Sequence, residues 1–429
     1  MRGRTAMPHA EFVRRDLLKG AICLGIMGAA PGYARAGARR FPAVRAMVDG
    51  VIGERAFPGA IVAIGERTNR PDYISSGTIA LDSALQVDEH TLFRVYSMTK
   101  PITGMAAMLL IAEGRMKIDQ PVADFIPGFA KMRVLANPGQ GVETRPATSA
   151  MTIRHLLTHT AGLGGGPAVK GPLKGIYEKL GLRQNLISHA ERLEQAPPSS
   201  LKDFADRLAA APLLSDPGTA WSYSVGLDLL GHIIEIVAGM PFEQFLERRF
   251  FAPLGMSNTF FYVPESKKAR LVTSYTGRSA KLTEVDAGPA SIFLNKPAFP
   301  SGGGGLISTA HDYDRFLAML ANNGRLGRTE VMPPDAVAAG TANLLPQGVS
   351  MRDYLGIPGV VGFGAGGCIA DHGGFKGLFG WMGAAGTIGF IVPAQRLRVT
   401  GLINNMSVFD FAMNLPKAVH DDLGSARTS

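Results

Sequence analysis

The feature that most constrains this chain is a serine and a lysine at the start of an apolar segment. Ser97 and Lys100 lie three residues apart, and residues 101–112 directly after them are almost wholly apolar. A spacing of three places both side chains on one face of a helix. A lysine at the start of a buried helix is disfavoured as an ammonium ion, because burial and the positive helix end both oppose its charge. The pair therefore predicts a serine nucleophile with an adjacent lysine base.

A second copy of the spacing provides an internal comparison. Ser199 and Lys202 follow two prolines in a polar, charged stretch. There Ser200 and Asp203 are typical of a capping box that begins a helix. Buried context favours function for the Ser97 copy and a structural role for the Ser199 copy.

The first 36 residues are expected to be an export signal. Arg14 and Arg15 resemble a twin-arginine motif, an apolar stretch covers residues 21–30, and Ala34-Arg35-Ala36 fits a signal-peptidase site. Cleavage after Ala36 predicts a periplasmic or secreted protein. A basic arm with an amphipathic helix is the alternative. No apolar run reaches the roughly eighteen residues of a membrane span, so none is expected after processing.

Charge and composition argue against several classes. Six basic and two acidic residues of the signal account for four of the nine net positive charges, which leaves +5. No basic cluster alternates with aromatic residues, so nucleic-acid binding is not expected. Apart from the isolated pair His155 and His159, the histidines are scattered and no Cys/His cluster exists, and the glycine run 302–305 lacks the Lys-Ser/Thr of a phosphate loop. We expect no metal and no other cofactor. Cys368 is expected to be a buried thiol.

Hydrophobic periodicity predicts that both ends of the chain contribute to one sheet. Residues 41–52 repeat apolar side chains at helical spacing, and the runs after them alternate as strands do. The expected strands are residues 59–65, 73–79, 384–392 and 397–404. Residues 409–423 are expected to form a closing helix. We therefore expect a discontinuous α/β part, about residues 37–130 and 300–429, around a mainly helical part of about residues 131–299.

Five segments together resemble the serine β-lactamase-like family, in the branch of class C β-lactamases, D-alanyl-D-alanine carboxypeptidases and family VIII carboxylesterases. They occur in the family's order over most of residues 41–405, at residues 93–100, 152–163, 217–224, 303–309 and 380–387. The resemblance implies an α/β fold with an antiparallel sheet flanked by helices and a mainly helical insertion.

The resemblance also implies roles for three side chains. Ser97 is the nucleophile, Lys100 is the adjacent base, and Tyr223 matches the tyrosine of the family's Tyr-x-Asn motif. The three would share a proton network in which the tyrosine and lysine accept the serine proton. The alternative for Tyr223 is a half-buried core tyrosine with an ordinary hydrogen-bond partner.

A third motif, Lys-Thr-Gly in the family, aligns with Trp381-Met382-Gly383. By resemblance, the backbone N–H groups of Ser97 and Ala384 form the oxyanion hole, and Gly383 lets the chain approach the substrate. His372 lies near this motif in sequence and is expected to line the site. His159 belongs to the second segment, which is structural in the family, and no Gly-x-Ser-x-Gly elbow exists to support a histidine triad.

Two departures from the family bear on the substrate. Val225 replaces the asparagine that binds a substrate amide, and Trp381 replaces the lysine that attracts the β-lactam carboxylate. An apolar rim of Trp381, Phe379, Leu378 and Phe375 would favour uncharged acyl groups. Trp381 also resembles family VIII carboxylesterases, which commonly have Trp-Gly-Gly.

We therefore expect an exported serine hydrolase that forms a covalent acyl-enzyme on short- to medium-chain esters. A β-lactamase, a D-alanyl-D-alanine carboxypeptidase or transpeptidase, and an acyltransferase are alternatives within the fold. A catalytically inert sensor or scaffold is the alternative of another class. The expected partner is a small ester or amide substrate, and the oligomeric state stays open.

Overall fold

The structure is a computed structural model that describes residues 40–53, 57–165, 169–182, 195–278, 281–351 and 359–428. The expected export signal, residues 1–36, lies outside these ranges. Among the described residues no single helix has the length and hydropathy of a membrane span. The helices Gly226–Ala238 and Phe242–Leu254 have that length and hydropathy only when they are taken as one pair, and this pair is bent by 76°.

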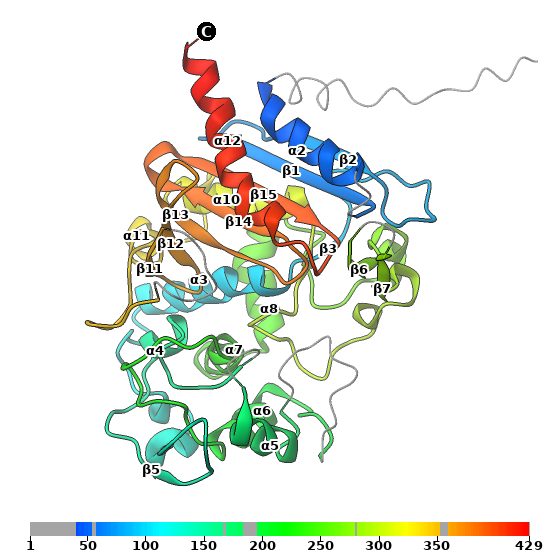
Figure 1. The fold of residues 1–429 in the computed structure, drawn as a ribbon. Coiled ribbons are helices and arrows are strands. Elements are labelled where there is room, and N and C mark those ends of the chain that lie inside the picture. Colours follow the sequence, from blue (N-terminus) through cyan, green and yellow to red (C-terminus); the bar gives the residue numbers. More distant parts are fainter. Residues whose placement is uncertain are drawn as a thin grey trace, which may run out of the picture.

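A seven-stranded antiparallel sheet combines the two ends of the chain, in the order β11-β12-β13-β14-β15-β1-β2 (Figure 1). Its strands are β1 (Gly59–Glu66), β2 (Asp72–Gly77), β11 (Val360–Phe363), β12 (Cys368–His372), β13 (Phe375–Met382), β14 (Ile388–Val392) and β15 (Leu397–Ile403). β1 pairs with β15, with Ala60 opposite Ile403. The α/β expectation is thus confirmed. β14 begins four residues later than expected, because Gly383 and Thr387 close a turn with a 2.8 Å backbone hydrogen bond.

Helices cover both faces of the sheet. α2 (Pro42–Gly53) and α12 (Asp410–Thr428) lie together on one face (Figure 1). Their apolar side chains and those of the strands beneath form one core, around Phe41, Val62, Phe390 and Phe411. α10 (Ala310–Ala321) packs against β1, β14 and β15 from the other face. Burial on both faces explains why the central strands β14, β15 and β1 are nearly continuous apolar runs.

α3 (Thr99–Ala112) is buried almost all round, as the sequence predicts. It packs against α7 (Gly226–Ala238) and α11 (Pro334–Thr341). Gly104 permits a close crossing, because a Cβ there would lie 2.2 Å from the carbonyl oxygen of Ala365. The largest core cluster includes residues of α3, α7 and α10, so the helical part shares its core with the sheet.

The remaining elements are short. The helices are α4 (Ile153–Leu157), α5 (Gly171–Lys179), α6 (Leu201–Ala209), α8 (Phe242–Leu246) and α9 (Ala252–Leu254), with a π-helical turn η5 (Glu247–Phe251). The 3₁₀ turns are η1 (Tyr96–Met98), η2 (Val122–Asp124), η3 (Pro127–Lys131), η6 (Glu265–Arg270), η8 (Gly288–Ala290), η9 (Ile292–Leu294) and η10 (Pro393–Gln395). Two-stranded pairs join β3 (Phe93–Arg94) with β8 (Ile307–Ser308), β4 (Arg133–Leu135) with β5 (Thr144–Pro146), β6 (Ser274–Thr276) with β7 (Thr283–Asp286), and β9 (Arg325–Leu326) with β10 (Thr329–Glu330).

The second serine–lysine copy has the structural role predicted for it. The Ser200 hydroxyl accepts a 3.1 Å hydrogen bond from the Asp203 N–H and caps α6. Lys202 is exposed and pairs with Asp206 at 2.6 Å. Nothing in this arrangement desolvates the lysine.

Candidate active site

Ser97 lies in the tight turn η1 that leads from β3 into α3. Tyr96, just before it, has a φ of 43°, a left-handed conformation that is uncommon for a bulky residue. The turn is fixed from two sides: Val95 donates its N–H to the carbonyl of Leu306 at 3.1 Å, and Tyr313 of α10 donates its hydroxyl to the carbonyl of Met98 at 2.8 Å. A strained turn held in this way gives the serine one position.

The structure brings the three expected reactive side chains together. Ser97 Oγ lies 2.6 Å from the hydroxyl of Tyr223. Lys100 Nζ donates to Ser97 Oγ at 3.1 Å and lies 4.6 Å from the centre of the Tyr223 ring. Both the lysine and the tyrosine are therefore within hydrogen-bond distance of Ser97 Oγ. Removal of the serine proton requires this geometry.

A carbonyl group that the sequence did not indicate completes the surroundings of Lys100. Lys100 Nζ donates a 2.5 Å hydrogen bond to the backbone oxygen of Gly303. Asp228, in the first turn of α7, accepts from the N–H of the same glycine at 3.0 Å and from the Ser301 hydroxyl. A Cβ at Gly303 would lie 2.3 Å from the Asp228 carboxylate, so only glycine fits there. Asp228 thus fixes the direction of the carbonyl that holds Lys100.

His159 supports the back of Tyr223. It is fully buried, its φ is 57°, and its ring centre lies 4.8 Å from that of Tyr223. Ser224 contacts its Nδ1 twice, through the N–H at 3.3 Å and the hydroxyl at 3.0 Å. Burial, and secondarily the charge of Lys100, hold the pKa of His159 well below its usual range. A neutral imidazole behind the tyrosine agrees with the structural role expected of this segment.

Trp381 lies next to Tyr223, and Val225 follows Tyr223 by two residues in the chain. The Trp381 ring stacks on the Tyr223 ring with centres 6.0 Å apart and 21° between planes. It is 4% exposed, and Phe363 meets its other side edge-on at 5.3 Å. Val225 precedes α7 directly and packs its side chain against the main core. The wall beside the reactive tyrosine is therefore aromatic and aliphatic.

The end of β13 reaches the nucleophile turn, as an oxyanion hole requires. A Cβ at Gly383 would lie 2.4 Å from the carbonyl oxygen of Val95, two residues before Ser97. Within the described part of the chain, the N–H of Ala384 finds no hydrogen-bond acceptor. Ser97 is the second residue of η1, so its N–H has no partner inside that turn. These two N–H groups suit the expected role.

His372 is placed elsewhere. Its Nε2 lies 2.8 Å from the carbonyl of Met413 in α12, so the ring joins β12 to the helix on the far face of the sheet. Cys368, Ala370 and His372 alternate onto the same face of β12, which meets α12 at Met413 and Pro416. The expectation that His372 lines the site is therefore not supported by its position.

The expected apolar rim is also corrected. Phe375 and Leu378 belong to the core beneath α2 and α12, and Phe379 is buried in the main core. Of the four residues, only Trp381 contacts Tyr223 among the aromatic contacts of the described chain. Phe375, Leu378 and Phe379 are therefore part of the hydrophobic core and do not form a rim around the site.

Arg94 is a second residue whose importance the sequence did not indicate. Its side chain is fully buried three residues before Ser97 and forms an ion pair with Asp286 at 2.5 Å. It also donates to the carbonyl of Val272 and to the Ser291 hydroxyl, at 2.6 and 2.9 Å. Arg94 thus ties the strand before the nucleophile to residues 272–291.

Neither a metal centre nor a second nucleophile emerges from the geometry. In the described ranges no three His, Cys, Asp or Glu side chains are arranged to hold a metal ion. Burial raises the pKa of the Cys368 thiol to about 12, so it is protonated at neutral pH. A protonated, buried thiol is unreactive, as expected from the sequence.

Comparisons with known proteins place this site in a family. The family model described as Beta-lactamase matches residues 44–421. Protein Rv1367c of Mycobacterium tuberculosis (strain ATCC 25618 / H37Rv) is 32% identical over 360 residues, which cover 81% of this chain and 86% of that protein. Esterase EstB of Burkholderia gladioli is 31% identical over 307 residues, which cover 66% of this chain and 71% of that protein.

Solved structures share the fold. The structure of EstCE1, described as a hydrolase with promiscuous acyltransferase activity, matches with a TM-score of 0.73 and 27% identity, covering 90% of this chain and 99% of that chain. An antiparallel sheet flanked by helices, with a serine–lysine–tyrosine centre, defines a serine hydrolase of the β-lactamase-like fold. This chain belongs to the beta-lactamase family, and one of its relatives, EstB, is named as an esterase. The family and fold expected from the five segments are confirmed.

Proposed function

We propose that this protein is a carboxylesterase that cleaves short- to medium-chain esters of uncharged acyl groups through an acyl-enzyme. The observation that carries the proposal is the stack of Trp381 on Tyr223. Trp381 takes the position that the family resemblance assigns to a carboxylate-binding lysine, and its ring is buried against Tyr223, so it offers no cation to a substrate. Val225 likewise offers no amide to a substrate side chain. An ester needs neither group, whereas a β-lactam loses two recognition contacts.

The chemistry proceeds in two half-reactions. Ser97 Oγ attacks the ester carbonyl while its proton passes to the Tyr223–Lys100 pair, and the N–H groups of Ser97 and Ala384 stabilise the oxyanion. The tetrahedral intermediate then collapses as the tyrosine hydroxyl returns the proton to the leaving alcohol. Water, deprotonated by the same pair, attacks the acyl-serine and releases the acid. Lys100, held by Gly303, keeps the shared proton next to the nucleophile throughout.

A panel of substrates tests the proposal. Purified mature protein should cleave p-nitrophenyl butyrate with a kcat/KM at least about a hundredfold above that for a chromogenic cephalosporin. The missing charge-assisted contact to the carboxylate is worth roughly 1.5–3 kcal/mol and the missing neutral contact to the amide roughly 0.5–1.5 kcal/mol, which together account for such a ratio. The Ser97→Ala variant is the control for both substrates. A preference for the cephalosporin would overturn the esterase proposal in favour of a β-lactamase.

Acyl transfer is a second candidate. It is favoured by the similarity to EstCE1, which is described as having promiscuous acyltransferase activity and whose structure matches 90% of this chain. In this reaction an alcohol replaces water in the second half-reaction. Adding a primary alcohol to the butyrate assay should then divert product from butyric acid to the butyrate ester of that alcohol, as measured by gas chromatography. Acid formation alone would restrict the enzyme to hydrolysis.

We further propose that the protein is exported by a twin-arginine route. The proposal is supported by the order of Arg14-Arg15, the apolar stretch and the site after Ala36. A variant with Arg14→Lys and Arg15→Lys should accumulate as precursor inside the cell, and the mature wild-type protein should begin near Gly37. Unchanged export of the double variant would refute this route.

A further inference from the structure

A cavity of about 440 Å³ lies away from Ser97, between α10 and the turn that joins β1 to β2. One face of α10 lines it, through His311, Asp314, Arg315, Ala318 and Asn322. The turn residues 67–71 and the segment at Glu89 and His90 form the opposite walls. This volume falls within the range of small-molecule sites in proteins.

The walls of this cavity are built and held in place. Arg398 is 3% exposed and pairs with Asp314 at 2.8 Å. It also donates to the carbonyls of Arg67 and Asn69, at 2.9 and 2.8 Å, so it holds the β1–β2 turn. Gly65 leaves room for its guanidinium, because a Cβ there would lie 2.3 Å from the arginine's Cζ. The turn is thus positioned by a buried ion pair.

The charges that remain on the walls are mostly positive. Arg398 and Asp314 neutralise each other within the wall. Three other arginines line the cavity, Arg67, Arg70 and Arg315, and the single remaining carboxylate is that of Glu89. Glu89 forms an ion pair with Arg70 at 3.8 Å. The lining therefore carries an excess of two positive charges even when both histidines are neutral.

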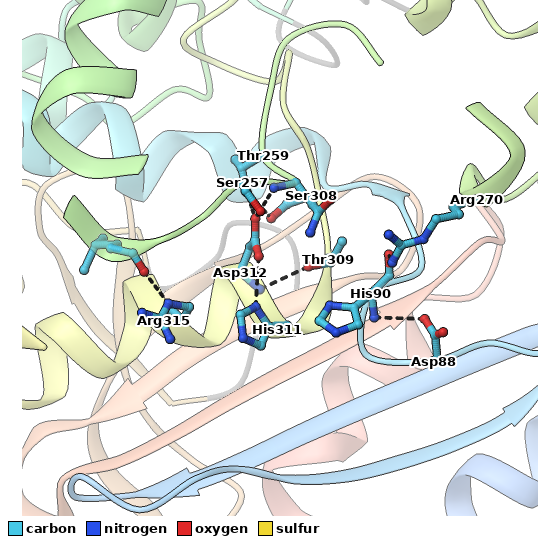
Figure 2. Close-up of polar contacts among 12 residues, drawn as sticks. Asp88, His90, Ser257, Thr259, Arg270, Ser308, Thr309, His311, Asp312 and Arg315 are labelled. Carbon is cyan, nitrogen blue, oxygen red and sulfur yellow. Dashed lines mark hydrogen bonds and ion pairs between the residues drawn. The ribbon is translucent and has the colours of Figure 1, made fainter. Parts of the chain in front are cut away.

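Two imidazole rings add a polar aromatic side. Figure 2 shows the rings of His90 and His311 next to each other, with Arg315 on the far side of His311. The ring centres are 5.2 Å apart. His311 Nδ1 lies 3.0 Å from Asp312 Oδ1, whose carboxylate also accepts the Asn258 N–H at 2.6 Å. Asp312 thus holds the His311 ring at the cavity wall.

We propose that this cavity is a second binding site, which takes a small organic anion with at least two negative charges, of the phosphate-monoester or polycarboxylate class. Guanidinium groups bind both kinds of oxyanion through paired N–H donors. Three arginines against one carboxylate leave a charge that a dianion neutralises. The site is separate from the Ser97 centre and does not depend on the ester reaction.

Calorimetric titration of the mature protein with inorganic phosphate and with citrate, at constant ionic strength, tests this site. Each anion should give saturable binding that sodium chloride does not reproduce. The Arg67→Gln and Arg70→Gln double variant should bind at least about tenfold more weakly, since a charge-assisted contact is worth roughly 10–150-fold. The Lys131→Gln and Arg133→Gln double variant, an equal charge change at the exposed positions of η3 and β4, should bind as the wild type does, and so should Ser97→Ala.

A variant that is expected to bind more tightly separates a change in affinity from a loss of structure, because a misfolded protein would bind more weakly. Glu89→Gln removes the one opposing carboxylate and should strengthen citrate binding severalfold. The thermal midpoint of each variant without anion verifies folding. Absence of saturable binding for both anions in the wild type would overturn the proposal. Equal affinity in the double variant, or binding lost in Ser97→Ala, would equally overturn it, because the anion would then bind elsewhere.

Discussion

Asp228 and Gly303 are joined by a 3.0 Å hydrogen bond from the glycine N–H to the carboxylate, and the carbonyl of the same glycine holds Lys100 at 2.5 Å. The two residues lie 75 positions apart in the chain. One residue, Gly303, therefore connects the first turn of α7 to the lysine beside Ser97. Asp228 touches none of the reacting atoms and acts as a positioning residue.

Replacing Asp228 tests this connection. Asp228→Ala removes the acceptor of the Gly303 N–H, so the carbonyl loses its fixed direction and Lys100 its position. We expect kcat for p-nitrophenyl butyrate to fall by about 10–100-fold, or roughly 1.4–2.8 kcal/mol, with little change in KM. Asp228→Asn keeps the acceptor oxygen and should restore most of the rate. Asp206→Ala, on the exposed side of α6, serves as the control. A folded Asp228→Ala protein with wild-type kcat would contradict the role.

Ser97 is expected to be the sole covalent site. A serine-reactive phosphonate should add its mass to the peptide containing Ser97 and leave the peptide containing Ser199 unmodified, because only Ser97 has a lysine and a tyrosine at its oxygen. Ser97→Ala should abolish both labelling and turnover. Intact-protein and peptide mass spectrometry measure the outcome, and a label on Ser199 would refute the assignment.

The Tyr223 hydroxyl is expected to carry a large share of the proton transfer. Tyr223→Phe removes the group 2.6 Å from Ser97 Oγ while the ring can still stack on Trp381. General acid–base groups contribute about 10²–10⁴-fold, so kcat should fall by that factor with KM nearly unchanged. Tyr262→Phe, at a tyrosine that is 39% exposed, is the matched control. A loss of less than about threefold would mean that Lys100 alone accepts the proton.

The buried ion pair of Arg94 and Asp286 is expected to stabilise the fold. Asp286→Ala leaves a fully buried guanidinium without its counter-charge, which typically lowers the free energy of unfolding by about 3–5 kcal/mol. Asp410→Ala breaks the exposed pair with Arg278 and should lower it by less than about 1 kcal/mol. Urea denaturation followed by circular dichroism compares the two. Equal effects would show that burial of Arg94 is unimportant.

Stability should fall at acid pH through His159. Its pKa in the folded protein is well below the unfolded value of about 6.5, because burial disfavours the imidazolium. The unfolded chain then binds more protons, so the free energy of unfolding decreases as the pH falls below about 6.5, by up to about 1.4 kcal/mol per pH unit. His155, whose pKa burial also lowers, acts in the same direction.

Comparing unfolding at about pH 7 and pH 5 isolates this contribution. His159→Gln should show a smaller loss of stability between the two conditions than the wild type. His232→Gln, on α7 away from Tyr223, should retain the full loss. The same pH dependence in His159→Gln and the wild type would rule out the buried imidazole as its source.

The sequence by itself predicted the general fold and the meeting of Ser97 and Lys100 at the start of a buried helix. Ser97 and Lys100 were predictable because a spacing of three along one helix is a local relationship, and an apolar run marks the helix as buried. The sheet was predictable because alternating and continuous apolar runs occur at both ends of the chain. Tyr223 was found through its flanking motif, since nothing local distinguishes a catalytic tyrosine from a core tyrosine.

Only the tertiary structure decided which distant residues support that pair. Asp228 with Gly303, and Arg94 with Asp286, meet across long stretches of chain, and no local pattern encodes such contacts. His372 and the expected rim were misplaced for a related reason. Cys368, Ala370 and His372 share one face of β12 by ordinary alternation, but only the tertiary structure shows that α12, and not Ser97, lies against that face. Side-chain type is a property of the sequence, whereas direction is set by the pairing of strands.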